Sequence, residues 1–226
     1  MFITLSGSQT GVNYRLYNGS TSVGSILPGT CSGLSFGLQT AVGTHRVQSL
    51  NAGNGCSAGM SGTALVSINA LPIVHTVTGG GSYCSGGNGV VVGLSGSTTG
   101  VRYQLYYNGL ASGAQVNGTG APLNFGMKTA AGSYSVQATS TSTGCVNNMS
   151  GTATININSL PVVYNVSGGG NYCAGGTGIS VGLEGTTSGI SYQLYKGTAA
   201  IGAAVTGSGS SIDFGMQTVA GTYSVQ

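Results

Sequence analysis

The stretch VRYQLYYNG at residues 101–109 holds the pattern that decides the fold. Val101, Tyr103 and Leu105 alternate with polar side chains, which is the period of a strand with one buried face. Asn108-Gly109 follows directly, and both residues tolerate the positive φ angles of a two-residue hairpin turn. The stretch therefore predicts a strand that ends in a tight turn and carries Tyr103 on its buried face.

This pattern occurs three times, because YQLY at residues 103–106 is followed by YQLY at 192–195 and preceded by YRLY at 14–17, each 89 residues apart. The same offset relates Leu71-Pro72 to Leu160-Pro161, GGGSYC at 79 to GGGNYC at 168, and FGMKTAAGSYSVQ at 125 to FGMQTVAGTYSVQ at 214. A length of 89 fits one small domain per repeat. We expect repeats at residues 1–71, 72–160 and 161–226, with only the middle one complete, in a piece of a longer array.

Alternating apolar residues recur through the middle repeat, and no window has the apolar spacing of a helix. The sets are Ile73/His75/Val77, Val90/Val92/Leu94, Leu123/Phe125/Met127, Tyr134/Val136 and Ala153/Ile155/Ile157. Six or seven short strands in 89 residues predict an all-β fold of tandem Ig-like antiparallel β-sandwiches. The Leu-Pro pairs interrupt strand pairing between repeats, so we expect short linkers and a semi-rigid string.

Composition excludes several functions. The 226 residues include 44 Gly but only five Lys/Arg and two Asp/Glu. The basic residues are scattered, whereas phosphate binding needs them clustered, so no nucleic-acid partner is expected. Glu184 and Asp213 are too few for paired acid–base catalysis or a calcium site. No apolar run is long enough to span a bilayer, and no signal peptide is visible.

The histidines indicate packing rather than chemistry. His45 aligns with Tyr134, and His75 aligns with Tyr164, so sister repeats fill both positions with a phenol ring. A phenol cannot replace a catalytic or metal-binding imidazole, whereas it can replace a packing ring. We therefore expect no catalytic residue, no metal site and no cofactor.

The five cysteines predict disulfides. Cys84 and Cys145 are the two that the complete repeat contains, and their pairing is the natural intradomain disulfide. A rival pairing, Cys56–Cys84 with Cys145–Cys173, would instead join neighbouring repeats. Zinc is disfavoured because no close pair such as C-x2-C occurs. Disulfides imply an oxidising location, outside the cell or in a periplasm. Cys31 aligns with glycine in both other repeats and is interpreted as an incidental thiol.

Tyr17, Tyr106 and Tyr195 have the opposite parity to Tyr103 and are expected on the outer face of the strand. An exposed tyrosine beside small polar residues can stack on a sugar ring or anchor a protein contact. The simpler interpretation is that these rings only cover the outside of the sandwich.

The motifs YCxGGxG, GLxGSxxGVxYQLY, FGxxTxAGxYxVxAT and a later GC resemble the tandem immunoglobulin-like repeats of very large secreted proteins from Bacteroidetes. Here they are carried by Tyr83-Cys84, Tyr103–Tyr106 and Gly144-Cys145. Such repeats often accompany a gliding-motility-associated C-terminal sorting domain. The resemblance implies export by a C-terminal-signal route and display at the cell surface as adhesins or stalks.

We therefore expect a non-enzymatic, glycine-rich repeat protein, secreted or at the cell surface, that acts as an adhesin or a spacer stalk. The alternative is a carbohydrate-binding module that uses the three outward tyrosines. The expected partner is a surface glycan or protein, and the shortage of charge is compatible with lateral self-association.

Overall fold

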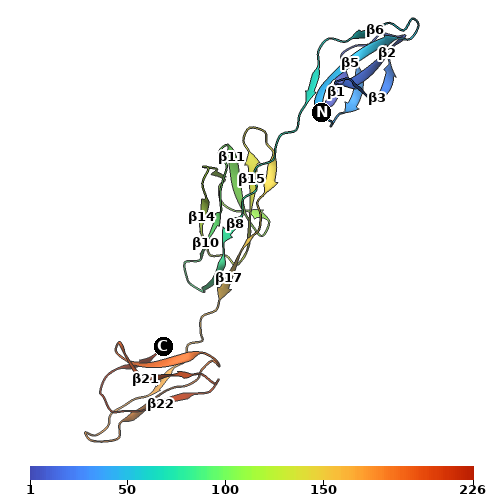
Figure 1. The fold of residues 1–226 in the computed structure, drawn as a ribbon. Coiled ribbons are helices and arrows are strands. Elements are labelled where there is room, and N and C mark those ends of the chain that lie inside the picture. Colours follow the sequence, from blue (N-terminus) through green and yellow to red (C-terminus); the bar gives the residue numbers. More distant parts are fainter.

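The structure is a computed structural model that describes residues 1–226, and strands are its only regular elements. The strands form three groups that follow one another end to end (Figure 1). No strand of one group pairs with a strand of another. We call these groups the first unit (β1–β7), the middle unit (β8–β17) and the third unit (β18–β23). None of the elements is a helix of the length and hydropathy that crossing a membrane requires.

The strand bounds are as follows. The first unit contains β1 (Phe2–Leu5), β2 (Val12–Asn18), β3 (Thr21–Pro28), β4 (Leu34–Leu38), β5 (Gly43–Asn51), β6 (Ser57–Gly59) and β7 (Ala64–Val66). The middle unit contains β8 (Val77–Gly79), β9 (Gly81–Cys84), β10 (Val90–Leu94), β11 (Val101–Tyr107), β12 (Leu110–Ala111), β13 (Val116–Asn117), β14 (Leu123–Lys128), β15 (Gly132–Ser140), β16 (Val146–Asn148) and β17 (Ala153–Asn158). The third unit contains β18 (Val166–Gly168), β19 (Ile179–Leu183), β20 (Ser191–Lys196), β21 (Ala199–Thr206), β22 (Ile212–Gln217) and β23 (Tyr223–Val225).

The middle unit is a β-sandwich. One sheet has the order β14-β10-β8, and the other has the order β12-β11-β15-β17-β9 with β13 and β16 at its margins. Side chains from both sheets meet in one buried core, formed by Val77, Val92, Leu94, Val101, Tyr103, Leu105, Leu123, Tyr134, Val136, Ala138, Met149, Ala153 and Ile155. The predicted all-β, antiparallel sandwich is confirmed, because every strand pair but one is antiparallel.

The exception is made by the glycine run that precedes Cys84. The run ends β8 and starts β9, so the chain crosses here from one sheet to the other. Gly79, Gly80 and Gly81 all have positive φ angles, of 89°, 80° and 128°. A Cβ on Gly80 would lie 2.7 Å from the carbonyl oxygen of Thr154. Glycine is needed for both reasons, and β9 then pairs in parallel with β17.

Tyr103 fixes the inner face of β11. Its side chain is 0% exposed, and its hydroxyl accepts a hydrogen bond of 2.9 Å from the Thr98 backbone N–H. A buried phenol needs such a partner to offset its lost hydration. The other units repeat this bond between Gln9 and Tyr14 (2.9 Å) and between Thr187 and Tyr192 (2.8 Å).

Residues 67–75 and 159–165 lie between the units, outside any strand. The first of these linkers is fastened to the middle unit. The amide of Asn147 donates to the Pro72 carbonyl at 2.9 Å, and the Ser150 N–H donates to the His75 carbonyl at 2.9 Å. The expected opening strand at residues 73–77 therefore forms only from Val77, since the residues before it follow the surface of the middle unit.

The predicted Cys84–Cys145 disulfide is not formed, and all five cysteines are free thiols. Cys84 lies beside Asn158, where β17 ends, whereas the Cys145 carbonyl accepts from Ser140 at the far end of β15. Because β15 starts beside β17 and spans nine residues, its two ends are separated by roughly 26 Å at the usual rise per residue. A disulfide needs Cα atoms within about 7 Å.

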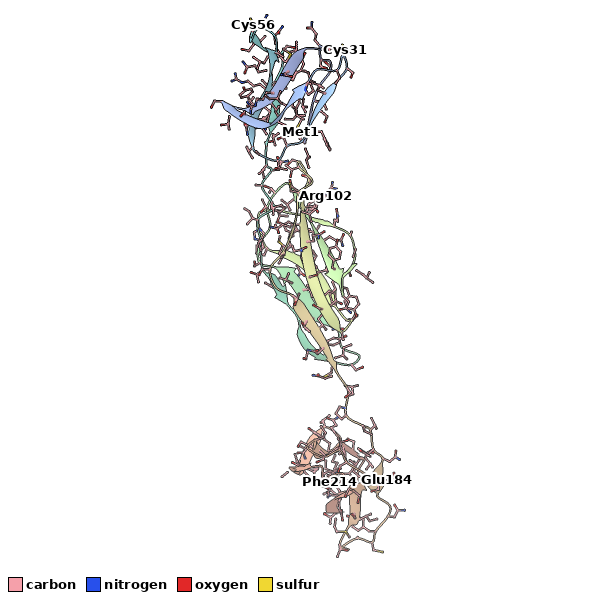
Figure 2. All side chains as sticks on the ribbon, turned by 90° about the vertical axis from the view of Figure 1, so that its right-hand side faces the viewer. Met1, Cys31, Cys56, Arg102, Glu184 and Phe214 are labelled. Carbon is pink, nitrogen blue, oxygen red and sulfur yellow. The ribbon has the colours of Figure 1, made fainter.

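The rival pairing fails in the same way. Figure 2 shows Cys56 at the end of the first unit that points away from the middle unit. Cys84 lies at the opposite end of the middle unit, next to the second linker. Position along the repeat did not reveal that its two cysteines lie at opposite ends of the sandwich.

Candidate functional site: the outer face of the tyrosine strand

β2, β11 and β20 are equivalent strands, and each pairs with a neighbour, β5, β15 or β23. The faces of these strands that point away from the core carry the three tyrosines predicted as ligand contacts. Tyr17, Tyr106 and Tyr195 lie there as expected, but all three are half-buried rather than fully exposed. Tyr106 is also tethered, since its hydroxyl donates to Gln137 Oε1 at 3.3 Å.

In the middle unit the residue two positions before the tyrosine is Gln104, and its amide nitrogen has all its donors in use. Gln104 Nε2 lies 2.9, 3.4 and 3.2 Å from the carbonyl oxygens of Leu105, Ser112 and Gly113. Gln193 repeats this arrangement in the third unit, with carbonyl oxygens at 3.0, 2.9 and 3.5 Å. At these two positions the side chain completes a bulged hairpin and has no donor left for a ligand.

The first unit differs at this position, because Arg15 stands where the other units have glutamine. The Nε atom of Arg15 is shielded from solvent and has no hydrogen-bond partner. A shielded donor of a charged group without a partner carries a desolvation cost. Arg15 is therefore a cation with unused hydrogen-bonding capacity.

A second arginine lies close by. The strand register places Tyr17 opposite Arg46 and Arg15 opposite Gln48, so the two arginines are diagonal neighbours about 7–8 Å apart between their backbones. The guanidinium carbon of Arg46 lies 5.8 Å from the centre of the Tyr17 ring, a cation–π contact that holds this side chain over the sheet.

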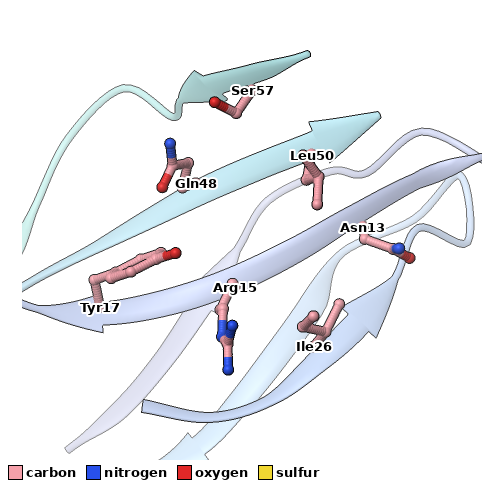
Figure 3. A pocket seen from close by; sticks show the side chains of 7 residues that line it. All are labelled: Asn13, Arg15, Tyr17, Ile26, Gln48, Leu50 and Ser57. Carbon is pink, nitrogen blue, oxygen red and sulfur yellow. The ribbon is translucent and has the colours of Figure 1, made fainter. Parts of the chain in front are cut away.

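A groove of about 210 Å³ runs over this face of the first unit. Figure 3 shows its lining, in which Arg15 lies between Tyr17 and Ile26 while Gln48 and Leu50 come from the neighbouring strand. Asn13 and Ser57 complete the wall. The groove thus combines a cation, a ring, two aliphatic side chains and several amide or hydroxyl groups.

The apolar part of the wall also distinguishes the first unit from the middle unit. Ile26 and Leu50 are 44% and 40% exposed. In the middle unit the residues at these positions are Gln115 and Thr139. Because the middle unit folds with polar residues at these positions, folding does not require the exposed apolar surface that Ile26 and Leu50 create. The first unit therefore has an outer face of different chemistry on the same framework.

Titratable groups elsewhere do not form a second site. The hydroxyl of Thr10, 2.9 Å from the thiol of Cys31, lowers the pKa of that thiol. The Ser180 hydroxyl and the Gly215 N–H lower the pKa of the Asp213 carboxyl. Burial raises the pKa of the Tyr134 phenol. These groups lie in different parts of the chain, and no three of the His, Cys, Asp and Glu side chains are grouped as metal ligands.

The two histidines pack as rings. His45 is 1% exposed and occupies the core position that Tyr134 has in the middle unit. His75 lies edge-on to the Tyr103 ring, with centres 6.4 Å apart. The burial of His45 and the ring contact of His75 agree with a packing role.

Comparisons with known proteins find similarity among solved structures only. No family model and no curated protein matches the chain. Among solved structures, the fibronectin(III)-like modules of Clostridium thermocellum CbhA align over 70% of this chain and 86% of theirs, with 16% identity and a TM-score of 0.36. The alignment with chicken CNTN1 FN1–FN3 domains covers 99% of this chain and 87% of theirs, with 12% identity and a TM-score of 0.32. The alignment with Sidekick-1 immunoglobulin domains 1–4 covers 96% of this chain and 62% of theirs, with 10% identity and a TM-score of 0.29.

Sequence reasoning missed Arg15 and Arg46 because they are 31 positions apart and were counted among scattered charges. Two signals were present. Arg15 replaces a glutamine that both other repeats have, and Arg46 replaces a serine found at Ser135 and Ser224. Both substitutions add charge on strands that pair, which a repeat-by-repeat comparison of outward positions would have shown.

Proposed function

We propose that the chain is a non-enzymatic array of Ig-like β-sandwich repeats, at residues 1–71, 72–160 and 161–226, that serves as a spacer stalk or adhesin. The observation that supports this function is the end-to-end order of equivalent units (Figure 1), each with the same buried tyrosine hydrogen bond. Each added repeat of this framework lengthens the array, and it does so without altering the packed core of the units that precede it.

Small-angle X-ray scattering of the full chain tests the stalk. A compact globule of this length has a radius of gyration of about 17 Å. Three units held end to end give a value roughly twice as large, together with a distance distribution that extends far beyond one unit. A radius near that of the globule would overturn the stalk.

The cell-surface location is part of the same proposal and depends on the motif resemblance, since the disulfide that pointed to an oxidising compartment is not formed. The test is surface proteolysis of intact cells that express the full protein, followed by detection with an antibody against this chain. Loss of signal from intact cells is expected, and protection until the cells are lysed would contradict it.

A second candidate function is carbohydrate binding by the outer faces. It is favoured by the tyrosines at equivalent positions and by the amide groups beside them, such as the Gln137 side chain that contacts Tyr106. A glycan array probed with the full chain tests this function. Binding that is lost in Tyr106→Ala, with an unchanged circular dichroism spectrum, supports it, and no binding to any glycan leaves the spacer role alone.

A further inference from the structure

We propose that the groove on the outer face of the first unit binds a carboxylated sugar, with the Arg15 guanidinium holding the carboxylate. This inference deepens the carbohydrate-binding candidate and is independent of the spacer role. It assigns a ligand class to one unit, whereas the tyrosines recur in all three.

The site carries positive charge that no acidic residue of the first unit neutralises. The first unit contains no Asp or Glu, because the two acids of the chain are Glu184 and Asp213. Arg15 and Arg46 therefore lie on one sheet face without an internal counter-ion. Two neighbouring cations repel each other, and an anion in the groove removes that repulsion. The uncompensated charge indicates an anionic ligand.

The geometry of Arg15 favours a carboxylate among anions. Its shielded Nε–H has no partner, although the equivalent Gln104 donates to backbone carbonyls at 2.9–3.4 Å. A guanidinium offers two parallel N–H groups that match the two oxygens of a carboxylate. A carboxylate in the groove would be held by the N–H groups of the guanidinium that face it, since Arg15 is part of the groove lining.

The remaining lining favours a sugar as the carrier of that carboxylate. The amides of Asn13 and Gln48 and the hydroxyl of Ser57 provide donors and acceptors for hydroxyl groups. Ile26 and Leu50 provide aliphatic surface for the C–H face of a sugar ring. Arg46 is outside the lining but is held over the Tyr17 ring, which belongs to it, so it would attract the carboxylate of an adjacent residue in an acidic oligosaccharide.

The experiment is titration calorimetry of the full 226-residue chain with trigalacturonate, an oligomer of a hexuronic acid. Galactotriose is the neutral probe, and triglutamate and acetate are the non-sugar carboxylates. We expect binding of trigalacturonate that weakens as salt rises, with little binding of the other three probes. Equal binding of triglutamate would assign the groove to an acidic peptide and overturn the sugar proposal.

Arg15→Gln is the decisive variant because both other units carry glutamine there and fold around it. It should weaken trigalacturonate binding roughly 10- to 100-fold, the size expected for loss of a charge-assisted pair. Arg46→Ser, also a sister residue, should weaken binding less. Arg102→Asn is the matched control, since it removes one charge from the middle unit (Figure 2) and introduces asparagine, the residue that the first unit has at the equivalent position 13.

The possible outcomes distinguish a specific carboxylate site from general charge attraction and from binding of neutral glycans. An equal loss in Arg102→Asn would mean general charge attraction and would overturn the site. Binding of neutral glycans that needs Tyr106, without binding of trigalacturonate, would refute this inference and leave carbohydrate binding intact. Absence of all glycan binding would refute both. Thermal melting of each variant reports whether the fold is retained.

Discussion

The hydrogen bond between Tyr103 and Thr98 should carry a measurable part of the stability of the middle unit. Tyr103→Phe keeps the buried ring but removes the acceptor of the Thr98 N–H, which lies at 2.9 Å. Leaving a shielded backbone donor without its partner costs about 1–3 kcal/mol. For a domain of this size each kcal/mol lowers the melting temperature by roughly 4–8 °C.

Hydrogen exchange followed by mass spectrometry is the appropriate assay, because peptides from β11 report the middle unit separately from the other two. Tyr106→Phe is the matched control. It makes the same atomic change in the same strand, but on the half-buried outer face and at a longer bond of 3.3 Å to Gln137, so an effect within about 0.5 kcal/mol is expected. If the two variants change the protection of β11 equally, the buried bond does not stabilise the unit and the reasoning is refuted.

Three further experiments test other features. Gly79→Ala should destabilise the middle unit strongly, because an added Cβ would lie 2.0 Å from a backbone carbonyl oxygen at a φ of 89°. The control Gly113→Ala, with a φ of 72° and open space around the added Cβ, should cost only the backbone strain. Equal unfolding midpoints of the two variants in urea would contradict this. Cys31 should be alkylated by iodoacetamide at a lower pH than the other four thiols, since its pKa is lowered, and mass-spectrometric mapping of the alkylated sites would reveal a different order. The folded-state pKa of Asp213 is lowered, so the contribution of this carboxylate to stability is present above its unfolded-state pKa and is lost as the pH falls through its folded-state pKa. Asp213→Asn should therefore lower the melting temperature at neutral pH but not in acid. A difference in melting temperature that persists in acid would show that the carboxylate charge is not its cause.

Strand positions and the buried face could be predicted from the sequence because alternation leaves a direct trace in residue order. Tyr103 and Leu105 are 0% and 1% exposed, as their parity indicated. The prediction failed where three-dimensional placement matters. Residue order did not show, for example, that the positive φ angles of the glycine run at 79–81 carry the chain to the other sheet.

The site shows the same limit. Parity placed Tyr17 on the outer face correctly, but it could not give the cross-strand register that sets Arg46 opposite this ring. Nor could it show that the Arg15 Nε is left without a partner. The disulfide prediction failed for a related reason, since spacing along the chain says nothing about which end of a sandwich a cysteine occupies.

The parallel pair of β9 and β17 has a mechanical consequence. β9 lies near the start of the middle unit and β17 at its end, and they run side by side in the same direction. Tension applied through the two linkers therefore pulls these strands past each other along their length. In this shearing geometry the hydrogen bonds of the pair share the load and must break together rather than peel apart one at a time, so the middle unit should resist a large stretching force before it unfolds.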